Sequence, residues 1–378
     1  MKLTYPHMGN AWIVIQALFN SLDIDIVTPP YNSKRTLNIG TKLAPESVCL
    51  PFKLNLGNYV EAAEQGADTI VITGGIGPCR FGYYGELQGQ ILQDAGYDYD
   101  VVILEPPDGS LLGLASRIKY LAGKKNSWPK IISAIRFAYY KSVACDRIED
   151  LIHGFRPKVK EPGQADQLYD HGRQKLANAM SYKEIDETVR WVQTKIREYQ
   201  AGLDTTIKPL KVGIIGEIYT VLDPFSSVEV EQQLGNLGVH VDRSIYLSGW
   251  VGQHVFQGLA QGYRSIKPYH RSAKKYLSHF VGGHGQESVG AAVKYAQEGF
   301  DGVIQILPLT CMPEIVAASI LPRVQEDYKI PIMTLTMDEH TGRAGVQTRL
   351  EAFVDLLERS RQSKEQLTRE DVLGFAGS

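Results

Sequence analysis

Apolar residues along this chain occur in two alternating patterns, short continuous runs and stretches with helical spacing, which together are typical of an α/β fold. In the N-terminal part the runs predict strands over 2–5, 25–28, 69–73 and 101–104. The helical spacing there predicts helices over 11–22, 51–65 and 84–95. Residues 110–206 have few strand signals and predict helices over 111–121, 128–153 and 164–200.

The alternation of strand and helix resumes at Leu210. Strands are predicted over 210–216, 239–246, 302–307 and 330–336. Helices are predicted over 226–237 with a cap at Ser226 or Ser227, from the GGHGQES segment (282–288) to residue 298, and over 313–326. A closing amphipathic helix has five apolar residues on one face: Val346, Leu350, Phe353, Val354 and Leu357.

This order of elements predicts the domain organisation. Strand, helix and strand in succession imply a parallel sheet with helices on both faces. A chain of 378 residues is long for one hydrophobic core. We therefore predict two Rossmann-like, flavodoxin-like α/β domains, an N-terminal one at 1–110 and a C-terminal one at 207–378, with a helical insertion or cap at 111–206 between them.

Two segments share one construction and predict an internal duplication. DTIVITGGIGPCR (68–80) and FDGVIQILPLTCMPE (300–314) each run from a strand through a loop to a cysteine before a helix. Upstream, ESVC (46–49) resembles ESVG (287–290), and EAAEQGAD (61–68) resembles KYAQEGFD (294–301). On this alignment Cys49 is equivalent to Gly290.

Composition and charge exclude several classes of protein. The chain has 40 basic and 42 acidic residues, and its lack of a basic run argues against a nucleic-acid partner. The first apolar segment, 11–19, is too short to span a bilayer and has no basic leader. Four cysteines without a CxxC pair do not form a secreted disulfide framework. We expect a cytoplasmic protein.

Three of the four cysteines are candidate metal ligands. Cys49, Cys79 and Cys311 each lie next to a predicted helix N-terminus, where the helix dipole and free amides favour a thiolate or an anionic cluster. Their spacings of 30 and 232 residues exclude a compact zinc ribbon or ferredoxin loop, but a site assembled between two domains tolerates them. Thiolates select zinc, copper(I) or iron-sulfur clusters. The alternative is that each is a small buried apolar residue.

Four segments resemble the iron-sulfur protein family of the 2-hydroxyacyl-CoA dehydratase component type. They are ESVCLPFK (46–53), GGIGPCRFGYYGELQ (74–88), FDGVIQILPLTCMPE (300–314) and MDEHTGRAGVQTRLEAFVDLL (337–357). They are most similar to its branch related to acyl-CoA dehydratase activases, to which the double-cubane cluster proteins are also related. The resemblance covers most of the chain.

The resemblance implies a cofactor and a partner. By it, Cys49, Cys79 and Cys311 hold a 4Fe-4S-type cluster at the interface of two domains, with one iron open. A separate ATP-hydrolysing iron-sulfur activase supplies low-potential electrons, and a homodimer or heterodimer is expected. Cys145 has no equivalent in the family pattern and is either an inert helix residue or a fourth ligand from the cap. Four cysteines are too few for a double-cubane cluster, and no substrate can be transferred.

Other polar residues have two interpretations each. GGHGQES can cradle a phosphate or form a simple turn and cap. Asp338, Glu339 and His340 can supply acid and base groups or form a hydrogen-bonded loop that pairs with Arg349. His284 and Glu217 can likewise supply acid or base groups or have only a structural role. Arg80 either offsets cluster charge or is a solvated surface residue. No Walker A or GxGxxG motif is present, so this chain is not expected to hydrolyse ATP itself.

Three hypotheses for function follow. The first is an oxygen-sensitive reductase or dehydratase component whose open iron binds a small substrate or an acyl-CoA. The second is a non-catalytic electron carrier or scaffold of an activase/dehydratase complex. The third is a two-domain α/β binding protein with structural cysteines.

Overall fold

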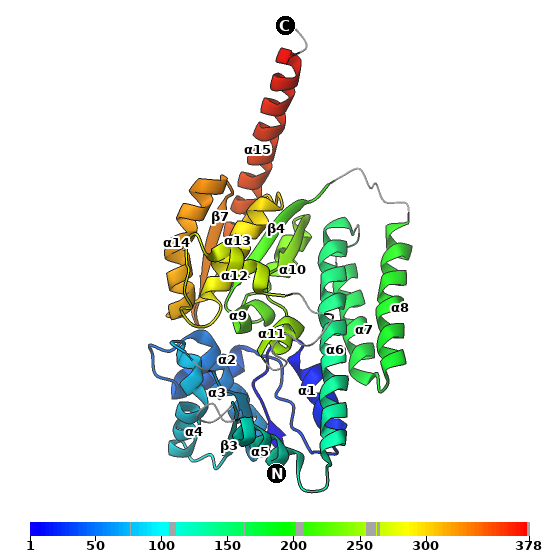
Figure 1. Cartoon of the computed structure of the whole chain (residues 1–378), viewed down its shortest axis with the longest axis vertical. Helices are drawn as coiled ribbons and strands as arrows, with labels where there is room; N and C mark the ends of the chain where they lie inside the picture. The colour runs from blue at the N-terminus through cyan, green and yellow to red at the C-terminus, as the bar shows by residue number, and fades with distance from the viewer. Residues whose placement is uncertain are drawn as a thin grey trace.

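Two parallel sheets organise the computed structural model, which describes residues 1–75, 77–105, 111–159, 161, 163–201, 208–254, 262 and 265–375 (Figure 1). The predicted α/β class with parallel sheets is confirmed. We call residues 1–105 the N-terminal half and residues 208–375 the C-terminal half. In Figure 1 the C-terminal half lies above the N-terminal half, and three long helices run beside both. None of the helices in the described ranges is long and apolar enough to cross a membrane.

The N-terminal sheet has its three strands in the order β1-β2-β3. The elements of this half are β1 (Leu3–Thr4), α1 (Ala11–Asn20), α2 (Lys34–Leu43), α3 (Leu50–Ala63), β2 (Thr69–Thr73), the 3-10 helix η1 (Arg80–Tyr83), α4 (Tyr84–Asp94) and β3 (Asp100–Leu104). The strand predicted over 25–28 is reduced to an isolated parallel bridge between Leu3 and Ile26. Pro29 and Pro30 follow directly, and proline has no N–H to extend the ladder.

Helices fill the region between the two sheets in the sequence. They are α5 (Leu111–Ala122), α6 (Trp128–Phe155), the 3-10 helix η3 (Arg156–Lys158), α7 (Gln164–Asn178) and α8 (Tyr182–Gln200). The prediction of a single helix over 164–200 is wrong, because the helix is interrupted at 179–181. Ser181 caps a new helix there by accepting a hydrogen bond from the Glu184 amide. Helix α6 packs against α1 of the N-terminal half and against α11 and β5 of the C-terminal half.

The C-terminal sheet has four parallel strands in the order β5-β4-β6-β7. The elements are β4 (Leu210–Gly216), α9 (Ile218–Leu222), α10 (Val230–Asn236), β5 (Val239–Arg243), α11 (Leu247–His254), α12 (Lys267–Ala273), α13 (Gly285–Gln297), β6 (Gly302–Pro308), α14 (Met312–Tyr328), β7 (Ile332–Met337) and α15 (Arg343–Phe375). The cap predicted at Ser226 or Ser227 is wrong. Both serines bond back to the Asp223 carbonyl in a turn, and α10 begins at Val230.

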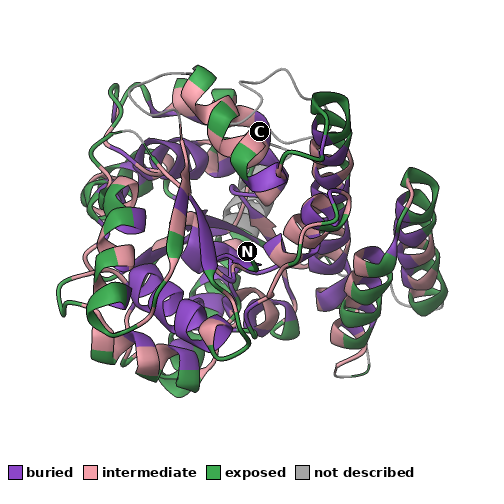
Figure 2. Ribbon diagram, turned by 90° about the horizontal axis from the view of Figure 1, so that it is seen from below, coloured by how far each residue is buried: buried purple, intermediate pink, exposed green. Residues whose placement is uncertain are grey.

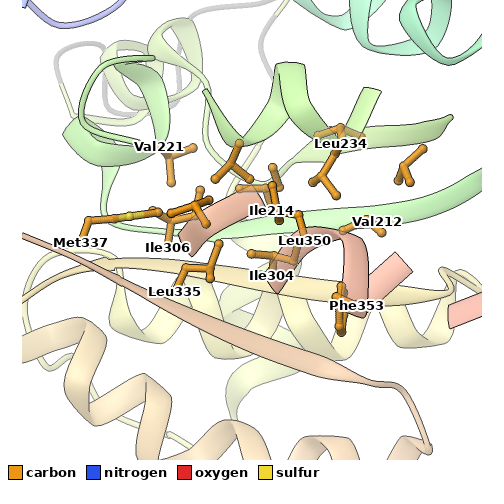
Figure 3. Packing of buried hydrophobic residues seen from close by; sticks show 14 of the residues in the cluster. Val212, Ile214, Val221, Leu234, Ile304, Ile306, Leu335, Met337, Leu350 and Phe353 are labelled. Carbon is orange, nitrogen blue, oxygen red and sulfur yellow. The ribbon is translucent and has the colours of Figure 1, made fainter. Parts of the chain in front are cut away.

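The buried residues of each half are mostly apolar. Figure 2 shows where the buried segments lie. Figure 3 shows the largest cluster, in which Val212 and Ile214 of β4 and Ile304 and Ile306 of β6 face α15. The five residues predicted to share one face of the closing helix are all buried in this cluster. The remainder of α15 projects beyond the sheet in Figure 1.

Two glycines mark similar helix contacts in the two halves. A Cβ at Gly57 in α3 would overlap the Thr36 carbonyl of α2, and a Cβ at Gly290 in α13 would overlap the Tyr269 carbonyl of α12. Each glycine lies twelve residues before the first residue of the next strand, β2 or β6. The predicted equivalence of Cys49 and Gly290 is therefore wrong, because Cys49 precedes its helix whereas Gly290 lies inside one.

Candidate metal centre

The three candidate cysteines occupy the same local position. Cys49 is the N-cap of α3, Cys79 is the N-cap of η1 and Cys311 is the N-cap of α14, as the sequence predicts. Proline in the first turn of α3 and of α14 fixes the start of each helix, since its missing N–H is not needed there. Each thiol is thus next to the free amides and the positive end of a helix or turn.

Arg80 connects the three cysteine segments. It follows Cys79 in the chain, and its Nη2 donates to the carbonyl oxygen of Thr310 at 2.7 Å. Its Nη1 donates to the carbonyl oxygen of Ser47 at 3.3 Å. Thr310 directly precedes Cys311, and Ser47 lies two residues before Cys49. One side chain therefore links the loops of both halves.

The GGHGQES segment packs on the Cys79 loop. Gly282 and Gly283 have positive φ values of 90° and 45°, a region that glycine adopts without strain. A Cβ at Gly282 would lie 2.8 Å from the Cys79 amide nitrogen, and a Cβ at Gly283 would lie 3.9 Å from the Cys79 Sγ. The glycines thus allow the C-terminal half to approach this thiol closely, and the segment continues into the turn and helix that the simpler interpretation predicts.

Burial and one carboxylate raise the pKa of all three thiols. Burial is the largest cause in each case, and the net pKa of Cys49 is raised to about 11. The Glu217 carboxylate also raises the pKa of each of the three thiols. The guanidinium of Arg80 acts in the opposite direction on Cys49 and Cys79.

Glu217 is held in place by the first turn of α9. Its two carboxylate oxygens accept from the backbone amides of Tyr219 at 3.0 Å and Thr220 at 2.9 Å, and Oε2 also accepts from the Thr220 hydroxyl at 2.8 Å. The sequence leaves its role open. In the structure it is a helix cap whose charge reaches the thiols from the C-terminal half.

Tyr84 is a site residue that the sequence analysis missed. Its hydroxyl is hydrogen-bonded to the Cys49 Sγ, and its ring packs edge-on against Phe52 with centroids 4.8 Å apart. The side chain is buried. Its place in the family-like segment GGIGPCRFGYYGELQ is the only signal that points to it.

The DEH segment, residues 338–340, forms a local loop and also links the two halves. The Asp338 carboxylate accepts from the His340 amide and the Thr341 hydroxyl, which makes the predicted hydrogen-bonded loop. Glu339 pairs with Lys53 of α3 at 2.5 Å, rather than with the predicted Arg349. Burial is the largest single effect and raises the pKa of Glu339, but the hydrogen bond and charge of Lys53, a backbone hydrogen bond and the charge of His340 together bring the net pKa below its usual value.

Cys145 lies apart from this arrangement. It is buried in α6 within the apolar core of the helical region, against residues such as Ile148 and Phe155. Burial raises the pKa of its thiol well above the usual value. This is the environment of the inert helix residue that one of the two interpretations predicts.

Exposed apolar side chains lie on or near the cysteine loops. They form an apolar rim made of Tyr83, Phe280, Leu309, Met312, Ile315 and Val316. Tyr83 belongs to η1, the last four flank Cys311, and a Cβ at Gly77 would lie 2.8 Å from the Phe280 ring. Groups of exposed apolar side chains are typical of interaction surfaces.

The thiols do not stand in a metal-binding arrangement as they are. Within the described ranges, no three or more histidine, cysteine, aspartate or glutamate side chains are grouped so that they could hold a metal ion. Cys49 is instead engaged by the Tyr84 hydroxyl. Searches of protein-family models and of curated proteins find no match to this chain.

Proposed function

We propose that this chain is an iron-sulfur reductase component in which Cys49, Cys79 and Cys311 hold a 4Fe-4S-type cluster between the two halves. The observation that carries the proposal is that Arg80, next to Cys79, bonds to the backbone of the Cys49 and Cys311 segments and so joins three N-cap cysteines from both halves. We also propose that the halves are domains related by duplication, because β1 and β4 occupy the same place in their sheets. Strand β1 lies between the bridge to Ile26 and β2, and β4 lies between β5 and β6.

The donor set matches the chemistry of such a cluster. Three thiolates with no histidine partner suit iron-sulfur clusters rather than hard cations. Two longer helix N-termini and the Arg80 guanidinium can offset the negative charge that three thiolates bring. Binding requires the three thiols to lose their protons and Cys49 to turn from Tyr84 toward the metal, since metal ligation is coupled to deprotonation.

The cluster would supply one-electron transfer at low potential. The residues of the chain have separate tasks: the cysteine loops position the ligands, Arg80 holds the loops, and the Glu217 carboxylate adds a fixed negative charge. Negative charge next to a redox centre favours its oxidised form and lowers its potential. This arrangement suits a strongly reducing component that acts on a small substrate or an acyl-CoA.

The apolar rim supports a protein partner at the same place. A donor must approach the cluster closely, and the exposed side chains of the rim lie on or near the cysteine loops. We propose an ATP-hydrolysing iron-sulfur activase as the electron donor, a cytoplasmic location, and a homodimer or heterodimer as the assembly. Since this chain has no nucleotide-binding motif of its own, the ATP step belongs to the partner.

The test is metal content in protein purified without oxygen. Iron, acid-labile sulfide and the EPR spectrum after dithionite are measured for the wild type and for Cys49→Ala, Cys79→Ala and Cys311→Ala, with Cys145→Ala as the matched control. We expect a cluster in the wild type and in Cys145→Ala and its loss in the other three. A folded, metal-free wild type would overturn the proposal and favour a small-molecule binding protein.

The apolar rim also favours the second candidate, a non-catalytic electron carrier or scaffold, because a carrier needs only a docking surface. The two candidates differ in what the reduced protein does alone. After reduction and removal of the activase, a reductase component changes the redox state of its acyl-CoA or small substrate, whereas a carrier leaves it unchanged until another enzyme is added.

A further inference from the structure

We propose that Arg80 is the positioning residue of the thiol site, holding the Cys49 and Cys311 segments against the Cys79 loop. This role rests on the proposed function, because it gives the three thiols a common purpose. The bonds themselves join residues 33 and 230 positions apart in the sequence. No other described side chain bonds to the backbone of both other cysteine segments.

The guanidinium is directed at backbone carbonyls and away from carboxylates. Across the described ranges no carboxylate lies within ion-pair distance of Arg80, although its side chain is on the surface. Its two terminal nitrogens instead bond to Ser47 in the N-terminal half and Thr310 in the C-terminal half. The planar fork of arginine can hold two acceptors at a fixed separation, which the single ammonium of lysine cannot do.

Thr310, which accepts one of the two Arg80 hydrogen bonds, has an unfavourable conformation. Its φ is 69°, in the left-handed region that a β-branched residue rarely adopts. Its Oγ1 is buried without a hydrogen-bond partner. Strained backbone persists where the surrounding structure fixes it and is concentrated at functional sites. The Thr310 carbonyl in this conformation accepts the shorter of the two Arg80 bonds.

A purely electrostatic role for Arg80 makes a different prediction. If the residue only offsets negative charge, lysine would replace it without loss. If it positions the loops through two carbonyls, lysine would fail almost as badly as alanine. The distinction can be measured in metal-free protein, because it concerns the distances between thiols and not the reaction.

The experiment is thiol cross-linking of the full-length, metal-free protein. Diamide takes two electrons and two protons from a pair of neighbouring thiols to form a disulfide, and mass spectrometry then measures the bonds among Cys49, Cys79 and Cys311. We compare the wild type with Arg80→Ala and Arg80→Lys. Arg35→Ala is the matched control, since Arg35 is an exposed arginine of the same half that pairs with Glu64.

We expect disulfides to Cys311 in the wild type and in Arg35→Ala, and a loss of at least five-fold in both Arg80 variants with unchanged thermal unfolding. The positioning role would be overturned if either Arg80 variant formed as much disulfide to Cys311 as the wild type. It would also be overturned if the wild type formed no such disulfide. Iron content of anaerobic protein is measured in parallel. If the anaerobic preparation contains no iron but the cross-links depend on Arg80, the proposed function alone is refuted. If it contains a cluster but the cross-links do not depend on Arg80, this inference alone is refuted.

Discussion

Cysteine is a weak choice for a helix cap. Serine, threonine, asparagine and aspartate are preferred at this position because their oxygen accepts from the first free amides. Cys49 and Cys311 nevertheless occupy the N-caps of α3 and α14, and neither makes a side-chain cap hydrogen bond. Capping therefore does not account for sulfur at these positions, as the proposed role of the thiols requires.

Tyr84→Phe tests how Cys49 is held. In the wild type, the Tyr84 hydroxyl bonds to the Cys49 Sγ, and this hydrogen bond lowers the pKa of the thiol. The substitution removes that hydroxyl. One hydrogen bond is worth about 1 kcal/mol, or roughly a factor of five in thiolate population. We expect alkylation of Cys49 by iodoacetamide at pH 8.5 to slow by about that factor in metal-free protein. Tyr83→Phe, at an exposed neighbour, is the control, and equal rates in all three proteins would contradict the hydrogen bond.

His7 predicts a pH dependence of stability. Burial lowers its pKa from 6.5 to about 4 while its Nδ1 donates to the Pro29 carbonyl. Between these two values the unfolded chain binds a proton at this imidazole that the folded chain does not. The free energy of unfolding therefore falls as the pH falls from 6.5 toward 4, by about 3 kcal/mol from this residue alone.

Urea unfolding at pH 7 and at pH 4.5 measures that contribution. His7→Asn keeps a donor for Pro29 but cannot be protonated, so its loss of stability between the two pH values should be smaller than that of the wild type by about 2 to 3 kcal/mol. His279→Asn at an exposed position is the matched control. Identical pH profiles for wild type and His7→Asn would show that His7 is not buried in its neutral form.

Local sequence predicts the cysteine positions but not their partners. Pro51 lies close to Cys49, and the strand β6 and Pro313 lie on either side of Cys311, so these neighbours in the chain form a pattern that can be recognised. The contacts of Arg80 with Thr310 and of Tyr84 with Cys49 depend on how distant segments pack. Nothing in the spacing of these residues indicates such contacts.

At the scale of elements, the errors have two different causes. The break between α7 and α8 was readable, because Ser181 and Glu184 form an S-x-x-E capping signal. Helix α2 was not predicted, because only three of its residues, Leu37, Ile39 and Leu43, are large and apolar, and its fully buried residues are Thr36 and Gly40. It packs on α3 through Gly40 and Gly57, a form of contact that hydrophobic spacing does not reveal.

Gly290→Ala tests this kind of packing in the C-terminal half. The added methyl group would meet the Tyr269 carbonyl of α12, and backbone cannot move aside as a side chain can. Overpacking of this kind costs about 3 kcal/mol. Gly345→Ala in α15, where a Cβ meets nothing within 4 Å, should instead add up to about 1 kcal/mol through helix propensity. Urea denaturation of both variants measures the difference, and equal effects would contradict the close contact of α12 and α13.

At the scale of the whole molecule, the two halves meet through loops at the carboxyl ends of their strands. The Tyr219 hydroxyl after β4 donates to the His7 carbonyl after β1 at 2.7 Å, and a Cβ at Gly9 would overlap the Leu222 carbonyl. Ligands of α/β sheets bind at this edge. Parallel sheets were predictable from the alternation of strand and helix, but their mutual placement was not, because it depends on contacts such as Lys53 with Glu339, 286 residues apart.

The Lys53–Glu339 pair should couple the stability of the two halves. Lys53 has a side chain only 4% exposed, so Glu339→Gln leaves a buried ammonium without its counter-charge and should cost about 3 kcal/mol. Lys53→Met leaves Glu339, which is 23% exposed and can be hydrated, and should cost less. In the double variant neither charge remains, and most of the loss in Glu339→Gln should be recovered.

The free energy of unfolding of the wild type, the two single variants and the double variant completes a double-mutant cycle. The expected sign is decisive, because Lys53→Met must stabilise the Glu339→Gln protein while it destabilises the wild type. Additive losses would mean that the two side chains do not meet and that the halves are joined differently around Cys49. A coupled pair would place the first turn of α3 against the loop after β7, which brings Cys49 to the C-terminal half as the proposed site requires.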